Sequence, residues 1–200
     1  MTLRIHALAF LVLLAAAPAC AEEDLTVYEL LAPQSHKFAI IYDVATSTPG
    51  ATFYLNPIRR GSKISDERVL DLATGKPLKF EIVDGRAASQ SGARPASTPA
   101  DSLFLKVYLA APVPAEGQAR IRIFKTYEDS ASYGREGDRI VFDRPLGIKR
   151  NVVVLPTGYE LIACTVPAIV STSPDGRVRV SMLNDRDDQL PVKITGRRLP

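Results

Sequence analysis

The sequence predicts an all-β protein, an antiparallel β-sandwich of about ten short strands with little or no helix. Three observations favour this fold. Short runs of β-branched and aromatic residues recur along the chain, glycine and proline separate these runs, and no stretch shows the 3.6-residue apolar period of a helix. Many short strands with such punctuation are typical of a β-sandwich.

The first expected strands end at recognisable turns. Residues 37–46 (KFAIIYDVAT) lead to the turn signal at 48–50, and residues 51–55 continue after it. Each run is rich in the residue types that fit a pleated, half-buried surface. The sequence therefore predicts two consecutive strands here.

A hairpin is expected next. Residues 69–72 and 78–83 flank a turn in which Gly75 supplies a permissive backbone and Pro77 opens the returning strand. A helical turn is expected only at residues 65–68.

Residues 84–101 have a different composition. They are rich in Ala, Ser, Gly and Pro and contain no large apolar residue. Such a composition predicts a long, flexible, exposed loop.

The second half of the chain returns to strands. In residues 118–127 (QARIRIFKTY), Ile121 and Ile123 occupy one face and Arg120 and Arg122 the other, as in a half-buried antiparallel strand. Further strands are expected at 103–109, 138–142, 150–155, 159–166, 177–182 and 191–195.

Residues 1–21 have the features of a signal peptide. Arg4 precedes a short apolar run, and Ala19-Cys20-Ala21 provides small residues for cleavage. The run is too short to span a bilayer. We therefore expect a periplasmic or secreted protein with one mature domain, residues 22–200. In the alternative, Cys20 receives a lipid anchor, although Ala17 and Pro18 depart from the usual lipoprotein pattern.

Composition limits the function classes. The chain has 25 Lys and Arg against 22 Asp and Glu, a net charge of +3, so no nucleic-acid partner is expected. After residue 21 no segment reaches the roughly 20 apolar residues of a transmembrane span. Cleavage after Ala21 leaves Cys164 as the only cysteine, so no internal disulfide is expected.

No motif indicates catalysis. A Cys164–His36 dyad is conceivable, but Cys164 lies in an apolar strand, where free cysteine usually packs as a small hydrophobe. The sequence has no zinc motif, and the acidic run 184–188 does not match a calcium loop. We therefore expect a protein that is not an enzyme, with no cofactor and no metal.

Basic side chains on outward strand positions are the first candidate binding feature. If residues 178–180 and 192–194 pair, some of these cations share a face and could meet an anionic envelope surface. Alternatively, they keep edge strands soluble. We call them the basic strip: Arg120, Arg122, Arg177, Arg179 and Lys193.

Tyrosines are the second candidate feature. Tyr127 and Tyr133 flank a short loop, and together with Tyr159 they could form a small carbohydrate platform. Aromatic residues near strand ends also serve as core plugs.

Residues 125–133 (KTYEDSASY), 142–151 (FDRPLGIKRN) and 155–160 (LPTGYE) resemble a group of uncharacterised exported bacterial β-rich proteins. The strand-rich layout is also loosely similar to the non-catalytic β-domain of zinc aminopeptidases. The resemblance implies an exported β-domain and no activity.

Three functions follow as expectations. The first is a non-enzymatic interaction or accessory module of the bacterial envelope, with an envelope protein as partner. The second is a binding protein for an anionic or carbohydrate envelope ligand, and the third is a hydrolase that uses Cys164.

Overall fold

The computed structural model describes residues 24–200, which form fourteen strands, one short α-helix and one 3-10 helix, Pro33–Ser35. The expected signal peptide and Cys20 lie outside the described residues. Within residues 24–200, no helix is long and apolar enough to cross a membrane. The all-β fold with little helix is confirmed.

The largest layer is a seven-stranded sheet, which we call the large sheet. Its strand order is β12-β13-β10-β1-β2-β7-β4, and every neighbouring pair is antiparallel except β1 and β10. The strands are β1 (Leu25–Leu30), β2 (Lys37–Thr46), β4 (Lys63–Asp71), β7 (Ala119–Glu128), β10 (Arg150–Val154), β12 (Ile169–Thr172) and β13 (Val178–Leu183).

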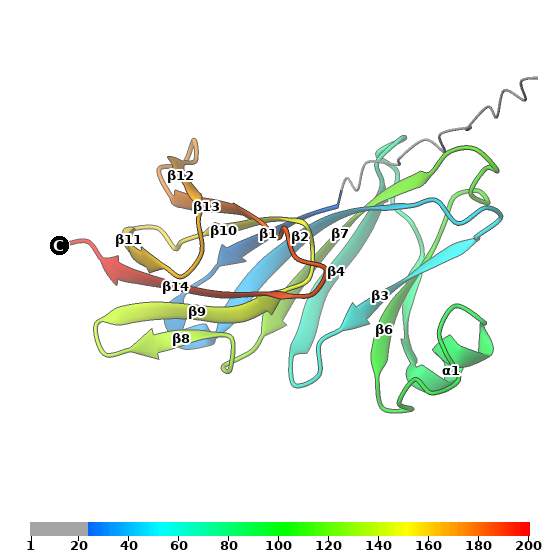
Figure 1. Cartoon of the computed structure of the whole chain (residues 1–200), viewed down its shortest axis with the longest axis horizontal. Coiled ribbons are helices and arrows are strands. Elements are labelled where there is room, and N and C mark those ends of the chain that lie inside the picture. The colour runs from blue at the N-terminus through cyan, green and yellow to red at the C-terminus, as the bar shows by residue number, and fades with distance from the viewer. Residues whose placement is uncertain (1–23) are drawn as a thin grey trace, which may run out of the picture.

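Two smaller antiparallel sheets complete the fold. The four-stranded sheet has the order β11-β14-β9-β8 and the three-stranded sheet the order β3-β6-β5. Their strands are β3 (Phe53–Ile58), β5 (Phe80–Asp84), β6 (Leu103–Tyr108), β8 (Tyr133–Glu136), β9 (Arg139–Leu146), β11 (Tyr159–Cys164) and β14 (Leu190–Arg198). Figure 1 shows the four-stranded sheet at the left and the three-stranded sheet at the right.

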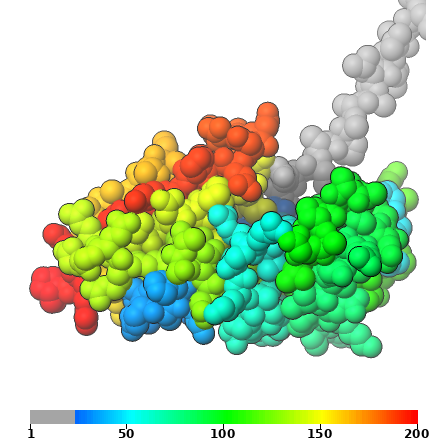
Figure 2. Space-filling model, turned by 90° about the horizontal axis from the view of Figure 1, so that it is seen from below, coloured from blue at the N-terminus to red at the C-terminus, as the bar shows by residue number. Residues whose placement is uncertain are grey.

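Both smaller sheets pack on the same face of the large sheet. Along β2, alternate residues from Phe38 to Val44 are buried, as a period of two requires. One core cluster joins them to Leu105 of the three-stranded sheet and Phe142 of the four-stranded sheet. The Phe142 ring lies 5.6 Å from that of Phe38. Figure 2 shows the smaller sheets side by side, β8 and β9 in yellow-green and β3 in cyan.

The expected loop at residues 84–101 begins with a helix instead, α1 (Gly85–Gln90). The Asp84 side chain caps this helix by accepting a hydrogen bond of 2.8 Å from the backbone N–H of Ala87. Ala88 is buried against Leu55 and Phe104, so α1 covers the outer face of the three-stranded sheet. A single small apolar residue suffices for this packing, and the composition did not reveal it.

The helical turn expected at residues 65–68 is wrong, because these residues belong to β4. The register of β4 against β7 shifts between Ser65 and Arg68, and Asp66 has a positive φ of 59°. These features mark a β-bulge, a local irregularity within a strand, and not a helical turn.

Of the hairpin expected from residues 69–72 and 78–83, only the turn end forms: the backbone N–H groups of Asp71 and Leu78 donate to the carbonyls of Lys76 and Val69 over 2.9 Å. β4 pairs with β7 in the large sheet, whereas β5 pairs with β6 in the three-stranded sheet. Leu70 and Pro77 form an isolated bridge at the point where the two segments diverge. Turn residues at Gly75 and Pro77 reverse the chain, but they do not determine which sheet each strand joins.

Candidate anion-binding cavity

A cavity of about 480 Å³ lies on the inner face of the large sheet, between the two smaller sheets. Its floor is formed by β1, β2 and β7, and β3 and β9 contribute opposite walls. We call it the cation–tyrosine cavity. Its lining residues are Thr26, Tyr28, Ile40, Tyr42, Tyr54, Asn56, Pro57, Arg59, Arg94, Lys125, Tyr127, Arg144, Pro145, Gly147, Ile148 and Gln189.

Lys125 faces the cavity because alternate residues of a strand lie on the same face, and Ile121, Ile123 and Lys125 are alternate residues of β7. The side chain is 6% exposed, and its Nζ donates a hydrogen bond to Asn56 Oδ1. Among residues 24–200, no carboxylate lies within ion-pair distance of this Nζ. Burial and the charge of Arg144 lower the pKa of the Lys125 ammonium to about 7.

Arg144 enters from β9, where it occupies the same inward positions as Ile140 and Phe142. It is 7% exposed, and its Nη1 donates hydrogen bonds of 3.2 Å to Asp129 Oδ2 and to Ser132 Oγ. Burial lowers the pKa of this guanidinium, which still remains protonated at neutral pH.

Aromatic rings surround the two cations. The Arg144 guanidinium lies 5.4 Å from the ring centroids of Phe38 and Tyr127, and Lys125 Nζ lies 4.9 Å from that of Tyr127. Ring faces attract cations and help to hold them away from water. Lys125 and Arg144 therefore share the Tyr127 ring as a common neighbour.

Asp129, which is not among the lining residues of the cavity, forms a buried ion pair with Arg144 and compensates its charge. Its carboxylate also accepts hydrogen bonds from Ser62 and Ser132, and it lies 3.9 Å from Nε of Arg59. Burial raises the pKa of Asp129, but the hydroxyl hydrogen bonds and the charge of Arg144 outweigh this effect and lower it.

Tyrosine hydroxyls form the opposite end of the cavity. Tyr42 donates a hydrogen bond of 2.9 Å to Asp24 and lies 3.3 Å from the Tyr54 hydroxyl. Burial raises the pKa of Tyr28, Tyr42 and Tyr54, so all three remain neutral donors. The four cations among the lining residues, with no carboxylate among them in the described chain, favour an anion with a small apolar part.

The structure separates the basic strip. Arg120 and Arg122 lie on β7, Arg177 directly precedes β13 and Arg179 lies on it, with β10, β1 and β2 between β7 and β13. Lys193 belongs to β14 in the four-stranded sheet. The expected pairing of residues 178–180 with 192–194 is wrong, since β13 pairs with β10 and β12, and β14 with β9 and β11.

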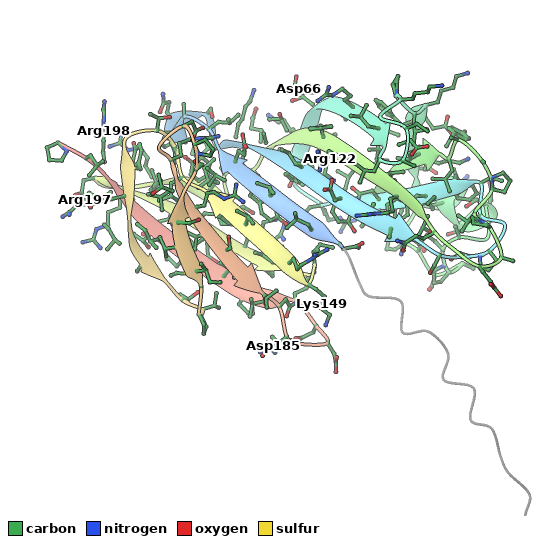
Figure 3. All side chains as sticks on the ribbon, turned by 90° about the horizontal axis from the view of Figure 1, so that it is seen from above. Asp66, Arg122, Lys149, Asp185, Arg197 and Arg198 are labelled. Atoms are coloured by element: carbon green, nitrogen blue, oxygen red, sulfur yellow. The ribbon has the colours of Figure 1, made fainter. Side chains whose placement is uncertain are left out.

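Acidic neighbours accompany several of these cations. Arg122 donates hydrogen bonds of 2.6 and 2.7 Å to Asp43, and Arg177 lies 2.6 Å from Asp175. Lys193 lies 3.9 Å from Glu136. Figure 3 shows Arg197 and Arg198 at one end of the molecule, far from Arg122 on the large sheet. The structure thus gives no continuous basic face from these residues.

The three tyrosines of the expected platform have different surroundings. Tyr127 is buried and lines the cation–tyrosine cavity, where its hydroxyl accepts a hydrogen bond of 3.2 Å from the backbone N–H of Arg59. Tyr133 is buried in the core, and its hydroxyl donates to the Leu31 carbonyl over 2.7 Å. Tyr159 is half-buried on β11. Tyr127 and Tyr133 are therefore core residues and do not form an exposed platform.

His36 and Cys164 occupy different environments. Nδ1 of His36 lies 2.9 Å from the Tyr133 carbonyl oxygen, whereas Cys164 on β11 is half-buried against the main core. Within residues 24–200, no group of three or more His, Cys, Asp and Glu side chains could hold a metal ion.

A second hollow, which we call the apolar groove, lies at the β12 end of the large sheet. Its volume is about 760 Å³. The Ile169 and Leu183 side chains at this groove are 74% and 70% exposed. The groove is lined by Leu25, Arg150, Asn151, Val152, Val166, Pro167, Ala168, Ile169, Ser181, Met182, Leu183, Asp185 and Leu190.

No protein-family model and no curated protein matches the sequence of this chain. Its fold is similar to those of a two-domain M1 zinc metallopeptidase bound to L-tryptophan (9% identity, TM-score 0.52) and the M1 zinc metallopeptidase from Deinococcus radiodurans (10%, 0.51). Both matches cover 87% of this chain and 41% of the other.

These matches concern the fold alone, because the identities are so low. This chain spans about two-fifths of the length of the two peptidases. The loose resemblance to a non-catalytic β-domain of zinc aminopeptidases is thus confirmed at the level of the fold.

Proposed function

We propose that the protein is an exported, non-enzymatic binding module of the bacterial envelope that holds a small organic anion in the cation–tyrosine cavity. The observation that carries this proposal is the buried Lys125. Its only hydrogen-bond acceptor among residues 24–200 is the amide oxygen of Asn56.

A buried ammonium without a carboxylate partner destabilises the folded state. Such a group is expected where it serves a ligand, because binding energy then compensates the desolvation of the charge. Arg144, Arg59 and Arg94 add positive potential to the same cavity. The apolar lining from Ile40 and Ile148 favours an organic anion over a bare inorganic ion.

A thermal-shift screen tests this proposal. The probes are acetate, pyruvate, lactate, inorganic phosphate and sulfate, at matched ionic strength. A ligand present at 100 times its Kd stabilises the folded protein by about 2.7 kcal/mol. We expect at least one organic anion to raise the melting temperature of the wild type and of Lys193→Met, but not of Lys125→Met. Equal shifts in all three proteins would contradict the proposal.

Export is supported by residues 1–21, and the mature N-terminus tests it. Intact-mass analysis of protein from a bacterial periplasmic fraction is expected to show a chain that begins at Glu22. A lipid-modified Cys20 would favour an anchored protein instead. A chain that still begins at Met1 would show that the expected cleavage after Ala21 does not occur.

A second candidate function is docking to an envelope protein through the apolar groove. Large side chains as exposed as Ile169 and Leu183 around one hollow are typical of protein-interaction surfaces. The fold also occupies only 41% of the two longer peptidase chains, which suits an accessory domain.

A further inference from the structure

Lys125 is suited to more than an electrostatic role. Burial and Arg144 lower its pKa to about 7, so a substantial fraction of its side chain is a neutral amine at neutral pH. A neutral amine attracts an anion weakly, but it has the free electron pair that a nucleophile needs. Burial among other cations increases the fraction of neutral amine and therefore favours a nucleophilic role for Lys125.

The cavity places a carboxylate-binding group beside this amine. Lys125 Nζ and the Arg144 guanidinium both lie against the Tyr127 ring, at 4.9 and 5.4 Å from its centroid. A guanidinium has five N–H donors, and the hydrogen bonds from Arg144 to Asp129 and Ser132 both leave from Nη1. Arg144 can therefore hold Asp129 and a ligand carboxylate together.

The surroundings of Lys125 also suit a carbonyl group. Asn56 Oδ1 accepts a hydrogen bond from Nζ and orients the amine, while Tyr28 presents a neutral hydroxyl to the same cavity. A hydroxyl donor can polarise a carbonyl oxygen and take up the proton changes of addition. No described carboxylate is close enough to form an ion pair that would keep the amine protonated.

We propose that Lys125 captures a small oxo acid as a reversible imine, with the acid's carboxylate held by Arg144. This inference rests on the proposed anion-binding function and names the class of its ligand. The neutral amine of Lys125 adds to the carbonyl carbon, and the resulting carbinolamine loses one water molecule to give the imine. Addition of water reverses the reaction, so no oxidant or reductant takes part.

Reductive trapping tests the inference. The protein is incubated with pyruvate and sodium cyanoborohydride, which supplies hydride to reduce the imine to a stable secondary amine. Intact-mass analysis and peptide mapping then locate the adduct. We expect one adduct per chain at Lys125, formed at least about tenfold faster than at Lys193, an exposed lysine beside the carboxylates of Glu136 and Asp143. Lactate, which has the carboxylate but no carbonyl, should slow the trapping.

Two variants serve as controls. Lys125→Arg retains the positive charge but cannot form an imine, so it should lose the adduct. Lys193→Arg should be trapped like the wild type. The lactate competition uses the wild type alone and keeps the test valid if Lys125→Arg fails to fold.

The outcomes separate the inference from the proposed function. Slow labelling spread over exposed lysines, with pyruvate and lactate still raising the melting temperature, would overturn the imine and leave anion binding intact. If no adduct is trapped and no anion raises the melting temperature, both the imine and the anion-binding function are overturned.

Discussion

Lys125 and Arg144 share one cavity but differ in how the protein compensates their charges. Arg144 forms a buried ion pair with Asp129 over 3.2 Å, whereas Lys125 has an amide oxygen as its partner. Glu67 is the acidic group that most favours the Lys125 ammonium, and Arg144 opposes it. Removing Arg144 and removing Lys125 should therefore change stability in opposite directions.

Replacing Arg144 should destabilise the protein. In Arg144→Met the buried Asp129 carboxylate loses its closest cation, and removal of one partner of a buried pair costs about 3 kcal/mol. Arg122→Met is the matched control, since Arg122 and Asp43 pair near the surface and such pairs contribute less than about 1 kcal/mol. Urea unfolding of both variants measures the difference. Equal losses would show that Asp129 does not depend on Arg144.

The pH dependence of stability should reveal the buried amine. The pKa of Lys125 is about 7 in the folded state and 10.5 in its ordinary state, so between these values the unfolded chain binds more protons. The free energy of unfolding due to this group therefore rises as the pH increases from about 7 to 10.5. Below about pH 7 the full penalty of the buried charge applies.

Unfolding of the wild type and Lys125→Met at several pH values measures this contribution, because their other titrating groups are shared. We expect the variant's advantage in stability to be largest below pH 7 and to shrink towards pH 10. An advantage that does not change with pH would mean that Lys125 titrates normally.

Both inward cations could have been predicted from strand periodicity. Alternate residues of a strand lie on the same face, so Lys125 shares the inward face of β7 with Ile121 and Ile123. In the same way, Arg144 shares the inward face of β9 with Ile140 and Phe142. The alternation that places Arg120 and Arg122 on the outward face applies equally to the charged residues on the inward positions. Asn56 and Asp129 could not be found this way, because their roles depend on contacts between distant strands.

At the scale of elements, α1 depends on its capping residue. Asp84→Ala removes the acceptor for the Ala87 N–H, and loss of such a cap costs about 0.5–2 kcal/mol. Asp84→Asn keeps an oxygen at the same position and should retain most of the stability. Hydrogen exchange at Ala87 measures the effect. Unchanged protection in Asp84→Ala would show that α1 is held by Ala88 packing alone.

The edge strand β12 allows a test of the docking alternative. All four of its residues are exposed, and Ile169 is the most exposed of the large apolar side chains in the described chain. Ile169→Lys should change the free energy of unfolding by less than about 0.5 kcal/mol, yet prevent crosslinking to an envelope protein in cells. Leu199→Lys, an exposed apolar site away from the groove, is the control. Crosslinking that survives Ile169→Lys would remove the groove from consideration.

Across the whole molecule, strand positions followed from sequence better than sheet membership did. The strand β2 was predicted to the residue, and the alternation in β7 was correct. The connection between β4 and β5 shows the limit: the expected turn forms, but the two strands join different sheets, because a local turn cannot specify which sheet a strand joins. β1, β8 and β12 were not expected, since their short polar-apolar patterns do not stand out without their partners.

The arrangement of the sheets also explains why the cavity exists. The large sheet is wide enough to carry both smaller sheets on one face, and their junction leaves β1, β2 and β7 incompletely covered. The inward residues beneath the junction are Tyr28, Tyr42 and Lys125 in place of the usual aliphatic side chains. Polar residues in a core favour a ligand-binding site over a junction between sheets that has only a structural role.

Urea unfolding of the wild type and Lys125→Met, each with and without pyruvate, tests the central claim most directly. Without ligand, Lys125→Met should be the more stable protein by on the order of 1 kcal/mol or more, because it removes a buried ammonium whose hydrogen-bond partner is a neutral amide. Pyruvate should stabilise the wild type and leave the variant unchanged. A less stable variant, together with no effect of pyruvate on either protein, would show that Lys125 is a structural residue and would contradict the account.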